Sequence, residues 1–176
     1  SDVIAHEYIK AVTLTGSEAA GIAVATEAGR QLKKCVLELG GSNAFVVLND
    51  ANQELALNLA IPARMQNGGQ SCIAAKRFIL ESWIAVDFLP RLADKVKELV
   101  IGDPMNEKTQ VGPLVSPDQA KEVEKQVAES IKMGAKLVLG GKRNGAFYEP
   151  TILSGVAPGM PAFDEEVFGP VFAVLE

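Results

Sequence analysis

The chain has 176 residues, of which 48% are hydrophobic and 22% are charged, and its formal net charge at pH 7 is −5. This composition is that of a globular protein with one or two domains. The negative charge argues against nucleic acid or an anionic membrane as a partner, and no apolar run approaches the roughly 20 residues of a membrane span. Residues 1–6 have neither the basic start nor the long apolar core of a signal peptide.

The first 40 residues predict a strand, a glycine turn, a helix and a second strand. The strands are expected over residues 9–15 and 35–39, and the helix from residue 18 to about residue 32. A helix start after a glycine turn offers free N–H groups to a phosphate. On its own, however, the spacing here favours an ordinary tight turn, because it departs from the Gly-x-Gly-x-x-Gly fingerprint.

The second strand carries one carboxylate, Glu38, among apolar neighbours. Alternation places Cys35, Leu37 and Leu39 on one face, and Val36 and Glu38 on the other. The carboxylate therefore lies either on a solvated face or in a desolvated position where it can act as a base. The pattern alone favours the solvated face, and it favours Cys35 as a small core residue.

Helices and strands continue to alternate along the rest of the chain, which is the order of an α/β protein. In chain order we expect a buried strand at 44–48, a helix at 53–66, a strand at 77–80, helices at 84–100 and 117–133, a strand at 136–139, an extended segment at 148–153 and a strand at 171–175. Asn67, Gly68 and Gly69 should break the first of these helices.

The predicted helices differ in their apolar faces. The helix at 53–66 repeats Leu55, Leu59 and Ala63 at helical spacing, and Pro62 could kink it or end it early. The core-facing stripe of the helix at 84–100 is made of Phe88, Leu92, Val96 and Leu99. The helix at 117–133 is heavily charged, and we interpret its charges as a solvated face.

Three short stretches carry the residues that could perform chemistry. They are LELGG at 37–41, GQSC at 69–72 and EEVFGP at 165–170. A lone cysteine or an acidic pair would ordinarily be a core residue or a surface feature. The three together, in this order and at this spacing, are similar to the signature stretches of the NAD(P)-dependent aldehyde dehydrogenase family.

The resemblance implies an α/β fold with an aldehyde dehydrogenase-like catalytic domain and the last piece of a dinucleotide-binding domain. Residues 1–40 would be the C-terminal part of the dinucleotide-binding domain, and residues 41–176 most of the catalytic domain. The chain then resembles a central fragment of the family's sequence. An oxyanion-hole Asn and a cofactor-binding Lys would precede it, and an oligomer-pairing strand would follow it, so the isolated chain is expected to be inactive.

The resemblance implies that Cys72 is the catalytic nucleophile and that Glu38 is the general base. A thiolate adds to the aldehyde, hydride then leaves the tetrahedral adduct, and a carboxylate activates the water that hydrolyses the resulting thioester. The backbone N–H of Cys72 would help to hold the oxyanion. The hydride acceptor would be NAD or NADP.

The resemblance also implies two groups of cofactor-binding residues. Those that would lie against the pyrophosphate are Gly16, Ser17 and Gly21. Those that would flank the nicotinamide and its ribose are Leu39, Glu166 and Phe168. Glu166 would accept hydrogen bonds from the ribose hydroxyls.

Residues 33–79 look most like bacterial succinate-semialdehyde dehydrogenases, with two departures. Gln66 stands where some members place an Arg that holds the substrate carboxylate, and the nearest basic residue is Arg64. Ala74 stands where some members place a second Cys as a redox switch, so no such switch is expected. A broad specificity for small aldehydes therefore stays open.

Two further alternatives remain. A relative that passes its acyl group to coenzyme A tends to lack the glutamate base, so Glu38 argues against it. A non-catalytic piece kept for its oligomer surface would leave Cys72 no more reactive towards alkylation than Cys35.

The chain's two cysteines suit neither a disulfide framework nor a zinc site, and free thiols suggest the cytoplasm. The expected partners are a small aldehyde and, in the full-length protein, further copies in a homodimer or homotetramer.

Overall fold

The computed structural model describes residues 2–176. The chain divides into two compact units, unit 1 (Ser1–Gly41) and unit 2 (Ser42–Glu176), which are described separately. This division lies one residue beyond the boundary expected from the sequence. Within the described residues, no helix is long and apolar enough to cross a membrane.

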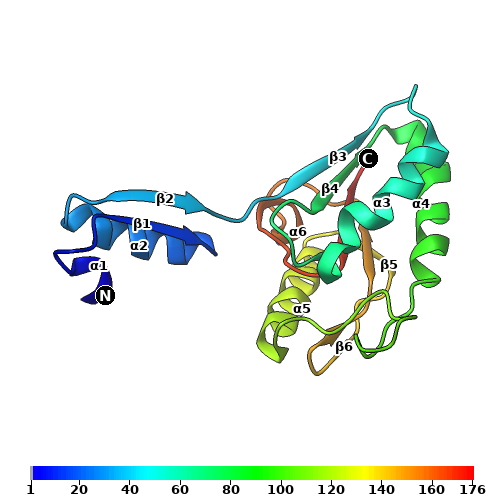
Figure 1. The fold of residues 1–176 in the computed structure, drawn as a ribbon. Helices are drawn as coiled ribbons and strands as arrows, with labels where there is room; N and C mark the ends of the chain where they lie inside the picture. The colour runs from blue at the N-terminus through cyan, green and yellow to red at the C-terminus, as the bar shows by residue number, and fades with distance from the viewer. Residues whose placement is uncertain (1) are drawn as a thin grey trace. The chain divides into compact units, whose positions relative to one another are not determined.

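Unit 1 consists of a parallel strand pair with helices. Its elements are α1 (Asp2–Ala5), β1 (Ala11–Thr15), α2 (Glu18–Arg30) and β2 (Lys34–Glu38). β1 pairs with β2 in parallel (Figure 1). In this register Thr15 lies opposite Glu38. The predicted strand–helix–strand order is confirmed. The predicted alternation is confirmed too, because Cys35 and Leu37 are half-buried while Val36 and Glu38 are exposed.

Unit 2 is built on a five-stranded sheet of order β3-β4-β9-β8-β5. The strands are β3 (Asn43–Val47), β4 (Ala75–Leu80), β5 (Lys136–Leu139), β8 (Thr151–Ser154) and β9 (Val171–Leu175). Every neighbouring pair is parallel except β5 and β8, which are antiparallel. The other elements are α3 (Gln53–Met65), the 3₁₀ turn η1 (Gln66–Gly69), α4 (Ser82–Lys97), α5 (Pro117–Lys132), the strand pair β6 (Arg143–Asn144) and β7 (Phe147–Tyr148), and α6 (Pro161–Asp164).

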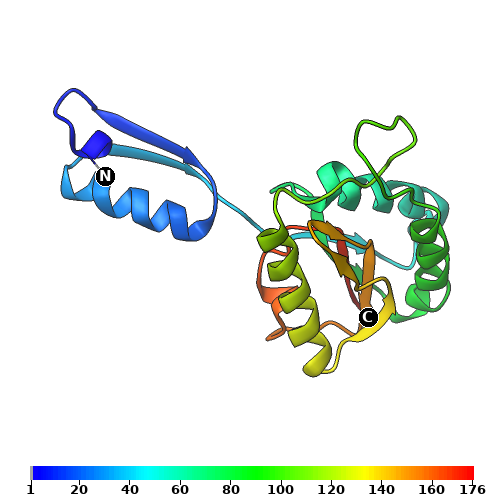
Figure 2. The ribbon, with the colours of Figure 1, turned by 90° about the horizontal axis from the view of Figure 1, so that it is seen from below.

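Helices cover both faces of this sheet. Figure 2 shows α3 and α4 on one side and α5 on the other. Successive residues of one strand point to opposite faces, so Phe172 joins the core beneath α3 and α4 while Ala173 joins the core beneath α5. Between the sheet and α4, the Phe78 ring lies 5.1 Å from the ring of Phe45 and 4.9 Å from that of Phe172. The sheet is therefore a rigid support for the loops at its edges.

One burial prediction was wrong, and the apolar repeat of one helix does not mark its buried face. The strand at 44–48 was expected to be buried, yet Val46 is 56% exposed, because β3 is an edge strand that pairs only with β4 among the described residues. In α3, Leu55 and Leu59 are exposed, and the buried residues include Leu57 and Arg64. The helix is turned so that a different face meets the sheet.

Several element boundaries also differ from the prediction. Pro62 does not end α3, which continues to Met65, and α4 ends at Lys97 rather than at residue 100. Leu99 lies beyond α4 but still packs against the core. The short helices α1 and α6 and the β6–β7 pair were not predicted.

Candidate active site

A turn of left-handed residues leads the chain from α3 to Cys72. Asn67, Gly68 and Gly69 have φ angles of 52°, 64° and 77°. Asn and Gly adopt this conformation at the least cost, so the sequence itself dictates the break. The predicted end of the helix at these residues is confirmed.

Gly69 is required by packing as well as by its φ angle. A Cβ atom built on Gly69 would lie 2.3 Å from the carbonyl oxygen of Gly169. A Cβ atom on Gly169 would in turn lie 2.7 Å from a methyl group of Val123 on α5. The turn before Cys72 is therefore in direct backbone contact with the third signature stretch, and only glycine permits this approach.

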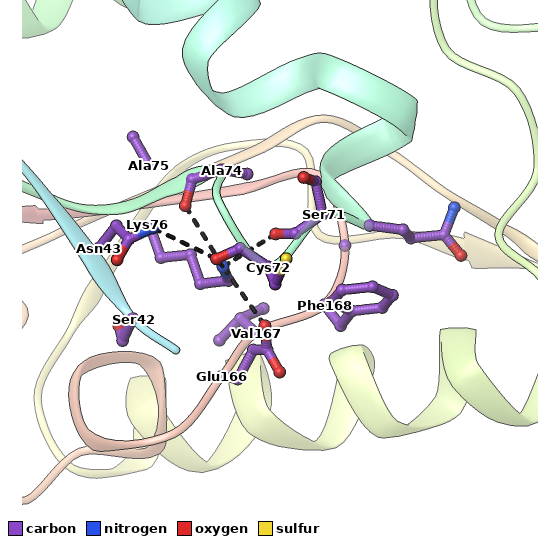
Figure 3. Close-up of polar contacts among 12 residues, drawn as sticks. Ser42, Asn43, Ser71, Cys72, Ala74, Ala75, Lys76, Glu166, Val167 and Phe168 are labelled. Atoms are coloured by element: carbon purple, nitrogen blue, oxygen red, sulfur yellow. Dashed lines mark hydrogen bonds and ion pairs between the residues drawn. The ribbon is translucent and has the colours of Figure 1, made fainter. Parts of the chain in front are cut away.

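Cys72 is exposed and forms no disulfide. Its carbonyl oxygen accepts hydrogen bonds from Asn43 Nδ2 at 3.2 Å and from Lys76 Nζ at 3.3 Å. Figure 3 shows Glu166, Val167 and Phe168 across from Cys72. The thiol is thus accessible to a small molecule, while the backbone that carries it is held from two sides.

Two glutamine side chains fix the loops around this turn. Gln70 donates to the Asn67 carbonyl at 3.1 Å and accepts from the Val115 N–H at 2.8 Å. Gln119 donates to the Phe168 carbonyl at 3.0 Å. Sequence reasoning missed both roles, and only the position of Gln70 inside the GQSC stretch signalled one of them.

Arg64 is fully buried and binds backbone carbonyls. Its guanidinium donates to Ala75 O at 3.3 Å, to Val167 O at 2.7 Å and also to Gly169 O. Burial lowers the pKa of Arg64 to about 9, although the negative charge of Glu166 opposes this shift. Because its donors are turned into the protein, Arg64 does not provide the cation expected for a substrate carboxylate.

Lys76 is a second buried cation at the site. Its ammonium contacts the carbonyls of Ser71, Cys72 and Ala74 at 3.0, 3.3 and 3.3 Å. It also forms an ion pair with Glu166 Oε1 at 3.4 Å (Figure 3). Burial lowers the pKa of Lys76, and Glu166 is the main opposing influence. Sequence reasoning missed Lys76, because a lysine next to a predicted strand ordinarily points to solvent.

The remaining predicted site residues gather in unit 1. Gly16 donates its N–H to the carbonyl of Glu38 at 3.0 Å, and the Ser17 hydroxyl caps the N-terminus of α2. A Cβ atom on Gly21 would lie 2.7 Å from Leu39 Cδ2, so helix and strand meet closely here. These five residues lie at the carboxyl ends of the parallel strands, where α/β proteins commonly bind ligands.

The predicted site is therefore assembled in two parts. Unit 2 brings Cys72, Glu166 and Phe168 together, and unit 1 brings Glu38 to the residues predicted to bind the pyrophosphate. Because the two parts belong to different units, the action of Glu38 on the Cys72 thioester stays a prediction.

The family model described as aldehyde dehydrogenase family matches residues 1–176. The chain belongs to the aldehyde dehydrogenase family. Both the family and the α/β fold class predicted from the sequence are confirmed by this match and by solved structures of family members. One of these, a succinate-semialdehyde dehydrogenase from Burkholderia pseudomallei, is 34% identical with a TM-score of 0.94, covering 99% of this chain and 37% of that one.

Similar curated proteins carry related names. Succinate semialdehyde dehydrogenase Sad of Escherichia coli (strain K12) is 49% identical over 99% of this chain and 38% of its own length, and its name includes the cofactor NAD(P)+. A probable succinate-semialdehyde dehydrogenase of Synechocystis is 48% identical over 97% of this chain and 38% of its own length, and its name includes NADP(+). The chain thus spans less than two fifths of these relatives.

Proposed function

We propose that this chain is the nucleophile-bearing part of an NAD(P)-dependent dehydrogenase that oxidises succinic semialdehyde to succinate. The observation that carries the proposal is the exposed Cys72, held on a glycine turn against the stretch that bears Glu166 and Phe168. The names of the relatives that are 49% and 48% identical support the substrate. The homo-oligomer and the cytoplasmic location predicted from the sequence remain predictions.

The chemistry follows from the thiol. The Cys72 thiolate adds to the aldehyde carbon and forms a C–S bond, which leaves an oxyanion on a tetrahedral carbon. The backbone N–H of Cys72 donates a hydrogen bond to this oxyanion. Loss of hydride from the same carbon oxidises the adduct to a thioester. Glu38 then takes a proton from water, the hydroxyl adds to the thioester, and the acid leaves as the thiolate is restored.

The residues of the chain fit NAD or NADP. Gly16 and Ser17 are exposed at the start of α2, where helix N–H groups can bind phosphate. The Glu166 side chain is one quarter exposed, so its carboxylate can accept hydrogen bonds from ribose hydroxyls, and Phe168 beside it is half-buried. When bound, the nicotinamide ring supplies the hydride acceptor.

Replacement of the nucleophile in the whole protein tests the proposal. Cys72→Ser should abolish aldehyde-dependent reduction of NAD(P)+, followed by absorbance, because a serine hydroxyl lacks the thiolate's nucleophilicity at neutral pH. The matched control is Cys35→Ser, which should retain activity because Cys35 lies half-buried in β2. Near wild-type oxidation by Cys72→Ser would overturn the assignment.

Paired substrates test the specificity. Succinic semialdehyde and butyraldehyde share a four-carbon chain and differ by the carboxylate. If the whole protein has a dedicated carboxylate pocket, kcat/KM should be more than about tenfold higher for succinic semialdehyde, since an ion pair in a dry site is lost with the other substrate. A ratio near one would indicate a broad-specificity aldehyde dehydrogenase instead.

A further inference from the structure

The Lys76 ammonium contacts both the segment 71–74, which carries Cys72, and Glu166, the residue proposed to bind the ribose. An ammonium has three N–H donors, and the three carbonyls of Ser71, Cys72 and Ala74 can accept all of them. The side chain is 1% exposed, so water does not compete for these contacts. Lys76 therefore binds the turn that presents the thiol through the donors that it has.

The contact of Lys76 with Glu166 is of a different kind. The two charged atoms are 3.4 Å apart, yet Glu166 Oε1 is buried and has no hydrogen-bond partner among the described residues. The attraction is therefore one of charge, and it is strengthened because the Lys76 side chain and Glu166 Oε1 are shielded from water. Figure 3 shows the second carboxylate oxygen of Glu166 pointing away from Lys76. That oxygen stays available to a ligand.

Lys76 carries a positive charge, which a side chain that only donates hydrogen bonds to carbonyls would not need. Burying an ammonium is unfavourable unless a negative charge faces it, and a neutral donor would have served the carbonyls alone at lower cost. Arg64, the other buried cation here, donates to backbone carbonyls of the same two segments. Only Lys76 forms an ion pair with the Glu166 carboxylate in the part of the chain that the structure describes.

We propose that Lys76 is a positioning residue for the cofactor: its buried ammonium holds the Glu166 carboxylate in place beside the turn that carries Cys72. The ribose-binding group and the nucleophile would then keep a fixed spacing, because both are bound to one cation. This inference rests on the function proposed above, in which Glu166 binds the ribose.

Nucleotide binding to the whole protein tests the inference without any aldehyde. The Kd values of NAD+ and NADP+ are measured by calorimetry for wild type, Lys76→Met, Glu166→Gln and the double variant. Lys76→Met should raise the Kd of the preferred nucleotide about tenfold, since a charge-assisted contact to the ribose loses its support. In the Glu166→Gln background the same change should add less than about twofold, because the two residues act through one contact.

Steady-state kinetics and control variants separate positioning from simple structural damage. Lys76→Met should raise KM for the nucleotide and leave KM for the aldehyde within about twofold of wild type. Lys76→Arg, which keeps the charge, should recover most of the nucleotide affinity. The matched control is Lys121→Met, which breaks an exposed ion pair with Asp118 and should change neither constant.

The inference would be overturned by an unchanged nucleotide Kd in Lys76→Met, or by equal effects of Lys76→Met with and without Glu166→Gln. If Lys76→Met does not fold, Lys76→Gln replaces it, because that side chain removes the charge and keeps two N–H donors for the carbonyls. Full nucleotide affinity in folded Lys76→Gln would likewise overturn the inference. A wrong function would appear separately, as aldehyde oxidation retained by Cys72→Ser.

Discussion

The two units of the chain differ sharply in how much apolar surface they bury. In the described residues of unit 1, only Ile4 and Ala28 are buried apolar side chains, and Leu32 is 96% exposed. Unit 2 has a core on each face of its sheet. A two-stranded sheet without such a core is marginal in water. The nucleophile is therefore carried by the unit with an extensive apolar core, and Glu38 by the unit with few buried apolar side chains.

Hydrogen exchange on the 176-residue chain would show the largest effect of this difference. Backbone amides in the central strands β4 and β9 should be protected by roughly a thousandfold or more, since they open only with the whole of unit 2. Amides of β1 and β2 should exchange almost as fast as in a free peptide. Equal protection in both units would contradict the difference in their buried apolar surface.

Core truncation is the next largest effect. Phe78 is fully buried between two other phenylalanine rings, so Phe78→Ala should destabilise unit 2 by about 3–5 kcal/mol in denaturant unfolding. The corresponding change in unit 1 is Val36→Ala, at a side chain that is 59% exposed. It should stay within about 0.5 kcal/mol of wild type. Similar costs at both positions would contradict the exposure of Val36.

Replacing one glycine in each unit by alanine should have opposite effects on stability. Gly69→Ala should cost about 2 kcal/mol or more and disturb the Cys72 turn, because its φ is 77° and a Cβ would meet Gly169 O at 2.3 Å. Gly29→Ala lies within α2, where nothing stands within 4 Å of the new Cβ. It should stabilise the helix by up to about 1 kcal/mol. Thermal unfolding by circular dichroism, together with the alkylation rate of Cys72, would measure both changes; a harmless Gly69→Ala would contradict the packing described above.

The smallest expected effect concerns alkaline pH. Burial raises the pKa of Tyr148 from 10.0 to about 12, so between these values the folded state keeps a proton that the unfolded state loses. Stability contributed by Tyr148 is therefore present below pH 10 and is lost as pH rises towards 12. Tyr148→Phe should flatten this loss in unfolding measured across that range. Tyr8→Phe, at a side chain 77% exposed in unit 1, should leave the loss unchanged; an unaltered profile in Tyr148→Phe would contradict the assignment.

Local patterns predicted what depends on the chain itself. The alternation in β2 placed Val36 and Glu38 on the exposed face, and Asn67, Gly68 and Gly69 marked the end of α3. Such features follow from side-chain period and backbone sterics, so they can be derived without tertiary structure.

Tertiary packing decided what the sequence could not predict. The exposed face of α3 contains Leu55 and Leu59, because the orientation of the helix is set by the sheet beneath it. Arg64 and Lys76 can be buried because backbone carbonyls accept their hydrogen bonds, among them Val167 O for Arg64 and Ser71 O for Lys76. A cation that is satisfied by backbone carbonyls leaves no periodic trace in the sequence.

The role of Cys72 as the nucleophile can be tested by trapping the acyl group on its sulfur. In the whole protein, Glu38→Gln should form the thioester with one turnover of reduced cofactor and then hydrolyse it slowly, because the water lacks its base. Peptide mass spectrometry after rapid acid quench should find the succinyl group on the peptide that contains Cys72 and none on the peptide that contains Cys35. An acyl group on Cys35, or cofactor reduction with no acyl group on Cys72, would contradict the claim.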